Sequence, residues 1–268
     1  MPKSPVSDNF ASLSAVAAAL AAAVAAAAYC SMPAKKQKTS ELSIGTHSGT
    51  FQCDEALGVW LLRQLPKWSG AKLVRSRNND VLDGISAADG IVIDVGGRYE
   101  HGALRYDHHQ RGFFETFDGA EGKATKAEEA TGAFAIKLSA TGLVYKHYGE
   151  EVLAALCPGL EGARLAAAYK RMYTDLIEGI DAIDNGIEIA PETKYKQTSN
   201  LSARVARLNP RWNAPKVDQA GEDALFEQAS ALTGAEFSEQ VRARFWLHFG
   251  HVWGVFGLTF VPDCMNRS

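Results

Sequence analysis

A short apolar run at residues 90–95, with the sequence Gly-Ile-Val-Ile-Asp-Val and two glycines after it, sets the fold class of this chain. The run shows no alternation of polar and apolar residues, which is typical of a strand buried on both faces, as in a parallel sheet. Asp94 lies at its carboxyl end. Because ligand sites in open parallel sheets form beyond the carboxyl ends of the strands, Asp94 is a candidate site residue.

Strand and helix signals alternate along the rest of the chain. A Gly-containing loop after the first expected strand opens a helix, which Pro66 closes. Apolar residues at helical spacing indicate three later helices. We expect strands at residues 42–46 and 72–76, and helices at residues 56–65, 132–147, 163–183 and 223–247. The sequence therefore predicts an α/β fold with a largely parallel sheet flanked by helices, and a helical C-terminal part.

Two adjacent histidines form the most unusual local pattern, Tyr-Asp-His-His-Gln-Arg at residues 106–111. At a strand end or in a loop, both imidazole rings of His108 and His109 can turn toward one centre. Imidazole is the commonest metal-binding side chain, and the neighbouring carboxylate of Asp107 can either bind the metal or fix the ring tautomer. The alternative interpretation is a surface loop with two solvated histidines.

Other acids and imidazoles are expected at the same edge of the sheet. Carboxylate and imidazole ligands without thiolates suit Mn²⁺, Mg²⁺, Fe²⁺ or Zn²⁺. The set is larger than one ion needs, so we expect a two-metal site, in which ions about 3.5–4 Å apart activate a water and hold the oxygens of a phosphoryl transfer. The candidate residues are His47, Asp54, Asp94, Asp107, His108, His109, Asp181 and Asp184.

Several of these residues also have structural interpretations. His47 alone is more often a hydrogen-bonded loop histidine than a ligand. Asp54 fits a helix cap, and Asp181 or Asp184 fits a solvated helix end. Asp94 is harder to explain without a partner, since a carboxylate at the end of an apolar strand is costly unless it is paired.

Three arginines are candidate contacts for a phosphate. Arg111, Arg204 and Arg207 either pair with structural acids or hold substrate phosphates by bidentate contacts. The chain has no GxxxxGK[ST] sequence, which excludes a P-loop.

Composition limits the partners of the chain. The 268 residues fit one large domain or two small ones, and their formal net charge of -3 gives no global basic surface. A nucleic acid would therefore need a local basic groove or metal ions to meet its phosphates. The four cysteines are widely scattered, which argues against a disulfide framework or a thiolate zinc site and for a reducing compartment.

Residues 1–40 do not have the pattern of a folded enzyme. An Ala-rich tract at residues 11–28 fits a cleaved targeting segment, a low-complexity extension or, less well, a membrane anchor, and we expect no stable membrane insertion. A basic stretch follows at residues 33–38, and Met32 is an alternative start. Further along, the Gly- and charge-rich residues 118–129 indicate a flap.

Five separated motifs, in the expected order, resemble those of the melanocyte-proliferating-gene exonuclease family, a group of metal-dependent hydrolases related to the DHH phosphoesterases. The resemblance covers about residues 42–215 and implies a DHH-type α/β domain and a divalent-metal 3′–5′ RNA exonuclease with mitochondrial, nuclear or nucleolar placement. The motifs are Ile-Gly-Thr-His-Ser-Gly-Thr-Phe at 44–51 together with Cys-Asp-Glu at 53–55, Val-Ile-Asp-Val-Gly-Gly at 92–97, the histidine pair at 106–111, Ala-Ile-Asp-Asn-Gly at 182–186, and the stretch formed by Leu-Ser-Ala-Arg-Val at 201–205 and Leu-Asn-Pro-Arg-Trp-Asn at 208–213.

The resemblance also implies roles for single residues. His47 and Asp54 would be ligands from the first motif, Asp94 the acid that bridges the metals, and His108 a further ligand. Asp181 or Asp184 would supply the last acid. His109 would face the scissile phosphate. Beyond the resemblance, we hypothesise that His109 and Arg204 stabilise the developing charge, with Asp107 as a further catalytic candidate and Arg111 and Arg207 as candidate substrate contacts. The expected cofactor is Mn²⁺ or Mg²⁺.

Two departures from the family pattern affect the expected function. The family usually has His where this chain has Gln52, and an amide oxygen is a poorer ligand, so we expect one metal position to be weak and activity to be reduced. The tail from about His248 does not resemble the usual continuation, which predicts a shortened substrate-side region. The predicted division is an extension at 1–40, a metal-binding domain at 41–190 and a partial substrate-side region at 191–268. The alternatives to an RNA exonuclease are a phosphoesterase for small molecules or short oligonucleotides, and a pseudoenzyme that binds metal or RNA.

Overall fold

Five short strands form a single sheet in the computed structural model of this chain, which describes residues 42–119 and 133–246. The strand order is β2-β1-β3-β5-β4, in which the first four run parallel and β4 is antiparallel at one edge. The strands are β1 (Ser43–Thr46), β2 (Lys72–Arg75), β3 (Ile91–Ile93), β4 (Tyr99–Glu100) and β5 (Arg105–Tyr106). The predicted α/β fold with a largely parallel sheet is therefore confirmed.

Strand β3 lies in the middle of this sheet, as its apolar run predicted. Ile44 of β1 pairs with Ile91, and Val92 pairs with Arg105 of β5. All three residues of β3 are fully buried. Their side chains alternate between two cores, because Ile91 and Ile93 belong to the main hydrophobic cluster whereas Val92 packs with Leu82 and Ile85 of the next layer.

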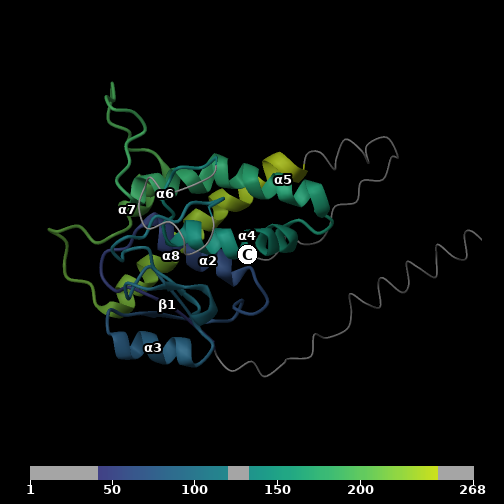
Figure 1. The fold of residues 1–268 in the computed structure, drawn as a ribbon. Coiled ribbons are helices and arrows are strands. Elements are labelled where there is room, and N and C mark those ends of the chain that lie inside the picture. Colours follow the sequence, from purple (N-terminus) through teal and green to yellow (C-terminus); the bar gives the residue numbers. More distant parts are fainter. Residues whose placement is uncertain (1–41, 120–132, 247–268) are drawn as a thin grey trace, which may run out of the picture. The chain divides into compact units, whose positions relative to one another are not determined.

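Helices cover both faces of the sheet (Figure 1). Helix α3 (Asn79–Ala87) packs against β1 and β3 on one face. Helix α2 (Cys53–Arg63) lies on the other, where it packs between α4 (Ala140–Leu156) and α8 (Gln219–Val241). Nine of the eleven residues of α2 are buried, so this helix is the centre of the larger core. Its first turn points at the carboxyl ends of the strands.

The predicted helix at residues 163–183 is helical but not regular. It consists of α5 (Gly162–Met172), a π-helical turn (Tyr173–Ile177) and α6 (Glu178–Asp184). Single π turns inside helices recur at functional sites, and here the turn directly precedes the helix that carries Asp181 and Asp184. Gly186 follows with a φ of 69°, so the helix ends with a residue in the left-handed conformation.

Several boundaries differ from the prediction. Helix α4 begins at residue 140, not 132, because residues 133–139 run as irregular chain, in which Leu138 N–H donates to Glu115 O (2.9 Å). Helix α8 begins at residue 219, where the Asp218 side chain caps it by accepting from Gly221 N–H (2.8 Å). Helices α3 and α7 (Leu201–Ala206) were not predicted as helices, although an Asn side chain caps each of them. The long α8 and its π-helical extension (Arg242–Trp246) confirm that the C-terminal part is helical.

Some predictions fall outside the described residues. These are the targeting, anchor and extension interpretations of residues 1–40, most of the predicted flap, at residues 120–129, and the tail from His248. The division into domains at residues 40 and 190 stays a prediction. Within the described ranges, no helix combines the length and the apolar character needed to cross a bilayer.

Candidate metal centre

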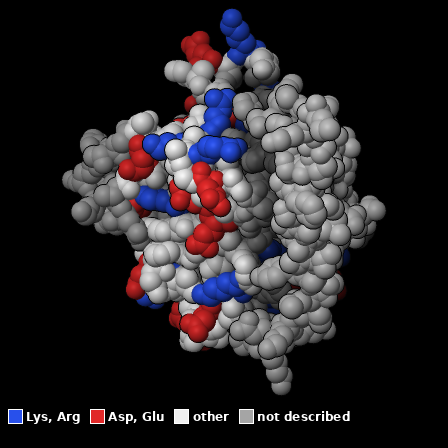
Figure 2. Space-filling view, turned by 90° about the vertical axis from the view of Figure 1, so that its right-hand side faces the viewer, with Lys and Arg blue, Asp and Glu red and all other residues white. Residues whose placement is uncertain are grey.

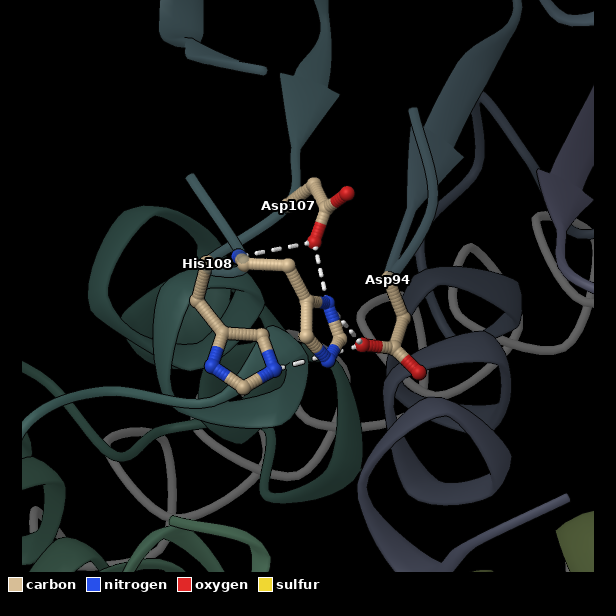
Figure 3. Close-up of side chains that lie close together, drawn as sticks. Asp94, Asp107 and His108 are labelled. Carbon is tan, nitrogen blue, oxygen red and sulfur yellow. Dashed lines mark hydrogen bonds and ion pairs between the residues drawn. The ribbon is translucent and has the colours of Figure 1, made fainter. Parts of the chain in front are cut away.

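Three neighbouring parallel strands each end directly before a candidate residue. His47 follows β1, Asp94 follows β3, and Asp107 and His108 follow β5. Because β1, β3 and β5 are adjacent and parallel, their carboxyl ends meet at one edge. Figure 3 shows Asp94, Asp107 and His108 extending from these strand ends toward a common region. The residue at the end of the central strand, Asp94, has a φ of 56°, which Asp tolerates better than most residues.

Two helix ends supply the remaining acids. Asp54 and Glu55 lie in the first turn of α2, where unpaired backbone N–H groups favour negative charge. Asp184 is the last residue of α6, where the helix dipole disfavours an acid. All three carboxylates point at the strand ends. We call the resulting group the acid–histidine cluster, and its members are His47, Asp54, Glu55, Asp94, His108 and Asp184.

Asp94 lies between the two halves of this cluster. Its Oδ2 is 3.2 Å from His47 Nε2, and the same nitrogen is 3.1 Å from Glu55 Oε1. Its Oδ1 is 3.3 Å from His108 Nε2, which in turn is 3.1 Å from Asp184 Oδ2. The Asp94 carboxylate is therefore placed to bind two cations at once.

The donor atoms form small groups of the size that a metal ion needs. In each group the atoms lie within 4.8 Å of one another. One group is His47, Glu55 and Asp94, and a second is Asp54, His108 and Asp184. A third contains Asp94, Asp107, His108 and His109. The third group shares Asp94 with the first and His108 with the second, so these donors lie together and could hold a metal ion.

The charges of the cluster are poorly compensated by the protein itself. The carboxylates of Asp54, Glu55 and Asp94 are buried, and the Asp184 side chain is 7% exposed. Each of the four has an oxygen without a hydrogen-bond partner within the described chain, and both ring nitrogens of His108 also have none. Burial, followed by repulsion from Asp94, Glu55 and Asp184, raises the pKa of Asp54 well above its ordinary value. Burial also raises the pKa of Asp184. Buried acids in this number need a cation, and hard oxygen and imidazole donors fit Mn²⁺, Mg²⁺ or Zn²⁺.

The imidazole of His47 partly fills the role of that cation. Burial would lower the pKa of His47, but hydrogen bonds and attraction from Asp94 and Glu55 raise it to about 10. Burial likewise would raise the pKa of Asp94, yet the contacts with His108 and His47 lower it overall. Metal binding must displace such protons, so the affinity of the site for cations depends on pH. Burial raises the pKa of the nearby Cys53 thiol to about 12, and Cys53 belongs to none of the candidate ligand groups of the described residues.

His109 differs from His108 in its exposure. Its side chain is 58% exposed, and its Nδ1 lies 2.7 Å from Asp107 Oδ1. Asp107 is buried and also accepts from the backbone N–H groups of Gly97 (2.5 Å) and His109 (3.1 Å). Asp107 therefore fixes the tautomer and orientation of His109, and leaves the outer edge of the ring open to a ligand.

Asp181, one of the two predicted final acids, lies outside the candidate ligand groups of the described chain. Its Oδ1 accepts from Ser139 N–H (3.0 Å), Ser139 O–H (2.6 Å) and Gly142 N–H (3.1 Å), and its Oδ2 accepts from Tyr173 O–H (3.0 Å). Gly142 permits this approach, since a Cβ there would lie 2.4 Å from the carboxylate. Asp181 thus holds α6 against the first turn of α4, and Asp184 one turn later reaches the cluster.

The predicted arginines lie away from the cluster. Arg204 Nη1 is 3.3 Å from Glu236 Oε2 on α8, and Arg207 donates to Thr198 O (2.8 Å). Arg111 is exposed in the turn after the histidine pair. Their predicted roles toward a substrate stay predictions.

Three residues of the site were not predicted. Glu55 Oε1 accepts from Gln52 N–H (2.7 Å) and faces His47. The sequence analysis predicted only its neighbour Asp54 as a metal ligand. Arg77 Nη2 lies 3.1 Å from His47 Nδ1, and buried Arg75 donates to His47 O (3.2 Å). The two adjacent acids at the start of a helix could have indicated a role for Glu55, whereas no sequence pattern indicated that Arg75 and Arg77 lie beside His47.

Gln52, where the family pattern has His, is the residue before the first turn of α2. Its side chain is exposed at the edge of two cavities that adjoin the cluster. The cluster consists of other residues of the motifs and does not include Gln52. That Gln52 reduces activity stays a prediction.

Comparison with known proteins places this site in context. A family profile described as MYG1 exonuclease, an uncharacterised protein family (UPF0160), matches residues 43–252. A human MYG1 exonuclease is 42% identical over 219 residues, which cover 79% of this chain and 54% of the human protein. A mouse MYG1 exonuclease is 42% identical over 223 residues, which cover 81% of this chain and 54% of the mouse protein.

More distant organisms give similar values. A MYG1 protein of Caenorhabditis elegans is 39% identical over 212 residues, which cover 78% of this chain and 56% of that protein. The chain spans about half the length of the curated relatives it matches. No solved structure matches the chain significantly.

Proposed function

The chain belongs to the MYG1 exonuclease family, and on that premise we propose that it hydrolyses phosphodiester bonds with the help of divalent cations, as a 3′–5′ RNA exonuclease. The relatives are named exonucleases, but this chain spans only about half of their length. The proposal therefore depends on what the described residues can do.

The observation that carries the proposal is the uncompensated acid–histidine cluster. His47, Glu55 and Asp94 would hold one cation, and Asp54, His108 and Asp184 a second, with Asp94 shared. Two such cations, Mn²⁺ or Mg²⁺, would supply water activation and charge neutralisation for cleavage at phosphorus. Carboxylate and imidazole donors fit these ions, and the cysteines of the site stay neutral thiols.

The exposed His109 would contact the phosphate itself. Its hydrogen bond with Asp107 raises the pKa of His109 above its ordinary value although partial burial opposes this, so the cationic form is favoured more than in a free imidazole. A cationic imidazole with its outer edge open can donate a hydrogen bond to a phosphate oxygen, where charge develops during cleavage. Asp107 would orient the ring and would act through His109 and not on the substrate.

A basic segment with exposed aromatic side chains supports RNA as the substrate. Residues 187–217 carry six Lys or Arg residues against two Glu residues, in a chain whose net charge is -3. Tyr195, between two lysines, is 74% exposed, and Trp212, beside Arg211, is 97% exposed. Figure 1 shows the segments before and after α7 as irregular stretches of chain that extend away from the helices. Exposed aromatic rings next to basic side chains suit the stacking of unpaired bases and contact with phosphates.

The described residues on the face shown in Figure 2 have no comparable excess of positive charge. On the described part of the face shown in Figure 2, acidic and basic side chains are interspersed. The segment at residues 187–217 is therefore the local basic surface that a chain of negative net charge needs in order to bind a nucleic acid.

The finer parts of the proposal rest on the family resemblance. We assign the fold to the DHH type because the residues after β5 read Asp-His-His and an acid ends the neighbouring β3. The 3′–5′ direction and a mitochondrial or nuclear placement are proposed on the same basis, with the Ala-rich residues 11–28 and the basic residues 33–38 as the supporting sequence. A fluorescent fusion of the full chain, compared with one that begins at Met32, tests the placement.

Replacement of Asp94 by Asn tests the hydrolase directly. Asp94→Asn should abolish Mn²⁺-dependent cleavage of a labelled single-stranded RNA, because the shared ligand is lost. Asp89→Asn is a matched control, since Asp89 has a similar φ of 58° before the same strand but is exposed. An unchanged rate in Asp94→Asn would contradict the proposal.

A phosphoesterase for short substrates is the competing function. Rates on a long single-stranded RNA and on a dinucleotide separate the two. A higher kcat/KM on the long RNA is expected if residues 187–217 bind the strand. Equal values would favour the smaller substrate.

A further inference from the structure

A cavity of about 460 Å³ adjoins the acid–histidine cluster, between the start of α2, the end of α6 and α7. Asp54 and Asp184 of the cluster form part of its wall. Its volume lies within the range of roughly 300–1,000 Å³ that is usual for small-ligand sites. A ligand in this cavity would therefore lie directly beside the reacting centre.

The wall of this α7 cavity is neutral and rich in hydrogen-bonding groups. Beyond the two acids, its polar side chains include Gln52, Gln197, Asn200 and Ser202, and no Lys or Arg among the described residues lines it. Apolar side chains, among them Phe51 and Ile180, complete the wall. Such a mixture does not suit a phosphate, which needs cations or many N–H donors, but it suits a flat, uncharged ring that carries amide-like edges and hydroxyl groups.

A second cavity on the other side of the cluster has the opposite character. It measures about 650 Å³ and is lined by the cationic Arg77, by His109 and by His47 and Asp94 of the cluster. Gly96 and Gly97 also line it, where the backbone can approach a ligand closely. Gln52 lines both cavities, so the two adjoin along the start of α2. The phosphate side and the neutral side of the site are thus distinct.

Hydrogen bonds fix the walls of the α7 cavity. Asn209 accepts from Phe51 N–H (2.9 Å) and donates to Phe51 O (2.8 Å), which ties the segment after α7 to the segment before α2. Asn200 caps α7, and its Oδ1 accepts from Ala203 N–H (2.8 Å). The cap determines which way the amide points, so the Nδ2 group of Asn200 is the one left to donate to a ligand. A carbonyl oxygen of a base or a ribose oxygen would accept from it.

We propose that the α7 cavity binds the sugar and base of the terminal nucleotide whose phosphodiester bond lies at the acid–histidine cluster. This assignment rests on the proposed function and names the part of the substrate that the neutral side recognises. It orients the substrate, with the nucleoside between α2 and α7 and the phosphate toward Arg77 and His109. Asn200 is then a residue that determines affinity for the nucleoside.

Two variants of α7 test the proposal without removal of the cluster. Asn200→Ser keeps a side-chain oxygen that caps the helix equally well but removes the amide donor. Ala206→Leu adds bulk at an exposed helical residue that lines the cavity. Asn78→Ser is the matched control, since it makes the same change at an exposed Asn whose side chain also caps a helix, α3, and which lines neither cavity.

The measurement is calorimetric binding of uridine and of adenosine to the Mn²⁺-loaded protein, because a nucleoside has no phosphate to cleave. We expect both nucleosides to bind, and Asn200→Ser to weaken binding by about fivefold or more, the usual value of one hydrogen bond. Ala206→Leu should weaken binding further, and Asn78→Ser should not change it. Inorganic phosphate should bind all four proteins equally.

Other outcomes would overturn the assignment. If neither nucleoside binds, or if both bind the two α7 variants as tightly as the control, the cavity is not a nucleoside site. This failure is distinct from failure of the proposed function, which would show as retained RNA cleavage in Asp94→Asn. Cleavage that is lost in Asp94→Asn, together with unaltered nucleoside binding in the α7 variants, would leave the hydrolase standing and reject the cavity alone.

Discussion

Asp181 and Asp184 lie one helical turn apart on α6, and their replacement by Asn should have opposite consequences. The Asp181 carboxylate accepts four hydrogen bonds from three residues, two of them from backbone N–H groups at the start of α4. Asn at this position keeps one oxygen and turns an NH₂ group toward donors. It leaves about two buried donors unpaired, at about 1–3 kcal/mol each.

The loss of stability from these unpaired donors is partly offset. Burial raises the pKa of Asp181 to about 7, so its ionised form is already costly and a neutral side chain removes that cost. We therefore expect Asp181→Asn to lower the free energy of unfolding by roughly 2–4 kcal/mol, below the sum of the lost bonds. Metal content per folded chain should be unchanged, because the carboxylate does not face the cluster.

Asp184→Asn should weaken Mn²⁺ binding without lowering the free energy of unfolding. Burial is the largest cause of its raised pKa, and the nearby Asp94 and Glu55 raise it further, so its removal relieves repulsion in the metal-free protein. The free energy of unfolding in EDTA should stay the same or rise. Affinity for Mn²⁺ should fall, because the group of Asp54, His108 and Asp184 loses a ligand.

Urea unfolding followed by circular dichroism in EDTA, together with Mn²⁺ titration of each folded variant, measures both quantities. The reasoning fails if Asp181→Asn unfolds at the wild-type urea concentration while its Mn²⁺ binding is weakened. That result would make Asp181 a ligand and its hydrogen bonds to α4 incidental.

Three further predictions follow from the same geometry. The pKa of Asp54 is raised and that of His47 is raised to about 10, so the folded metal-free protein binds more protons than the unfolded chain and loses stability as pH rises. Mn²⁺ should therefore raise the Tm more at pH 8 than at pH 5, as measured by differential scanning fluorimetry. An equal increase in Tm at both pH values would contradict this prediction. Gln52→His should raise the rate of RNA cleavage if the second metal position is weak, whereas an unchanged rate would favour a binding protein without turnover. Trp212→Ala should raise KM for a long single-stranded RNA by about five- to a hundredfold, the value of one stacked base, because the exposed ring is lost. KM for a dinucleotide should change little, and Trp212→Phe is the conservative control. An unchanged KM for the long RNA would show that Trp212 does not contact the strand.

The sequence was sufficient for β1, β2 and β3, whereas β4 and β5 were not among the predicted strands. The apolar run before Asp94 predicted a central parallel strand, and β3 is fully buried between β1 and β5. His47 and His108 follow neighbouring strands, so the placement of all three residues at one edge depends only on strand ends that can be found locally.

Contacts between distant segments could not be predicted in this way. The sequence left Asp181 and Asp184 as alternatives, because the spacing alone allows both to face one side of a helix. The choice depends on Ser139 and Gly142 of α4, about forty residues earlier in the chain. Glu55 was missed for a related reason, since only the position of the β1 end shows that His47 lies within reach of it.

Metal analysis of purified protein tests most directly whether the acids and imidazoles hold a pair of cations. After dialysis against Mn²⁺ and removal of free ions, mass spectrometry of the wild type and of Asp89→Asn should find about two Mn²⁺ per chain, and Asp94→Asn should retain one at most. Protein that retains no Mn²⁺, or an Asp94→Asn variant with the wild-type content, would contradict the account.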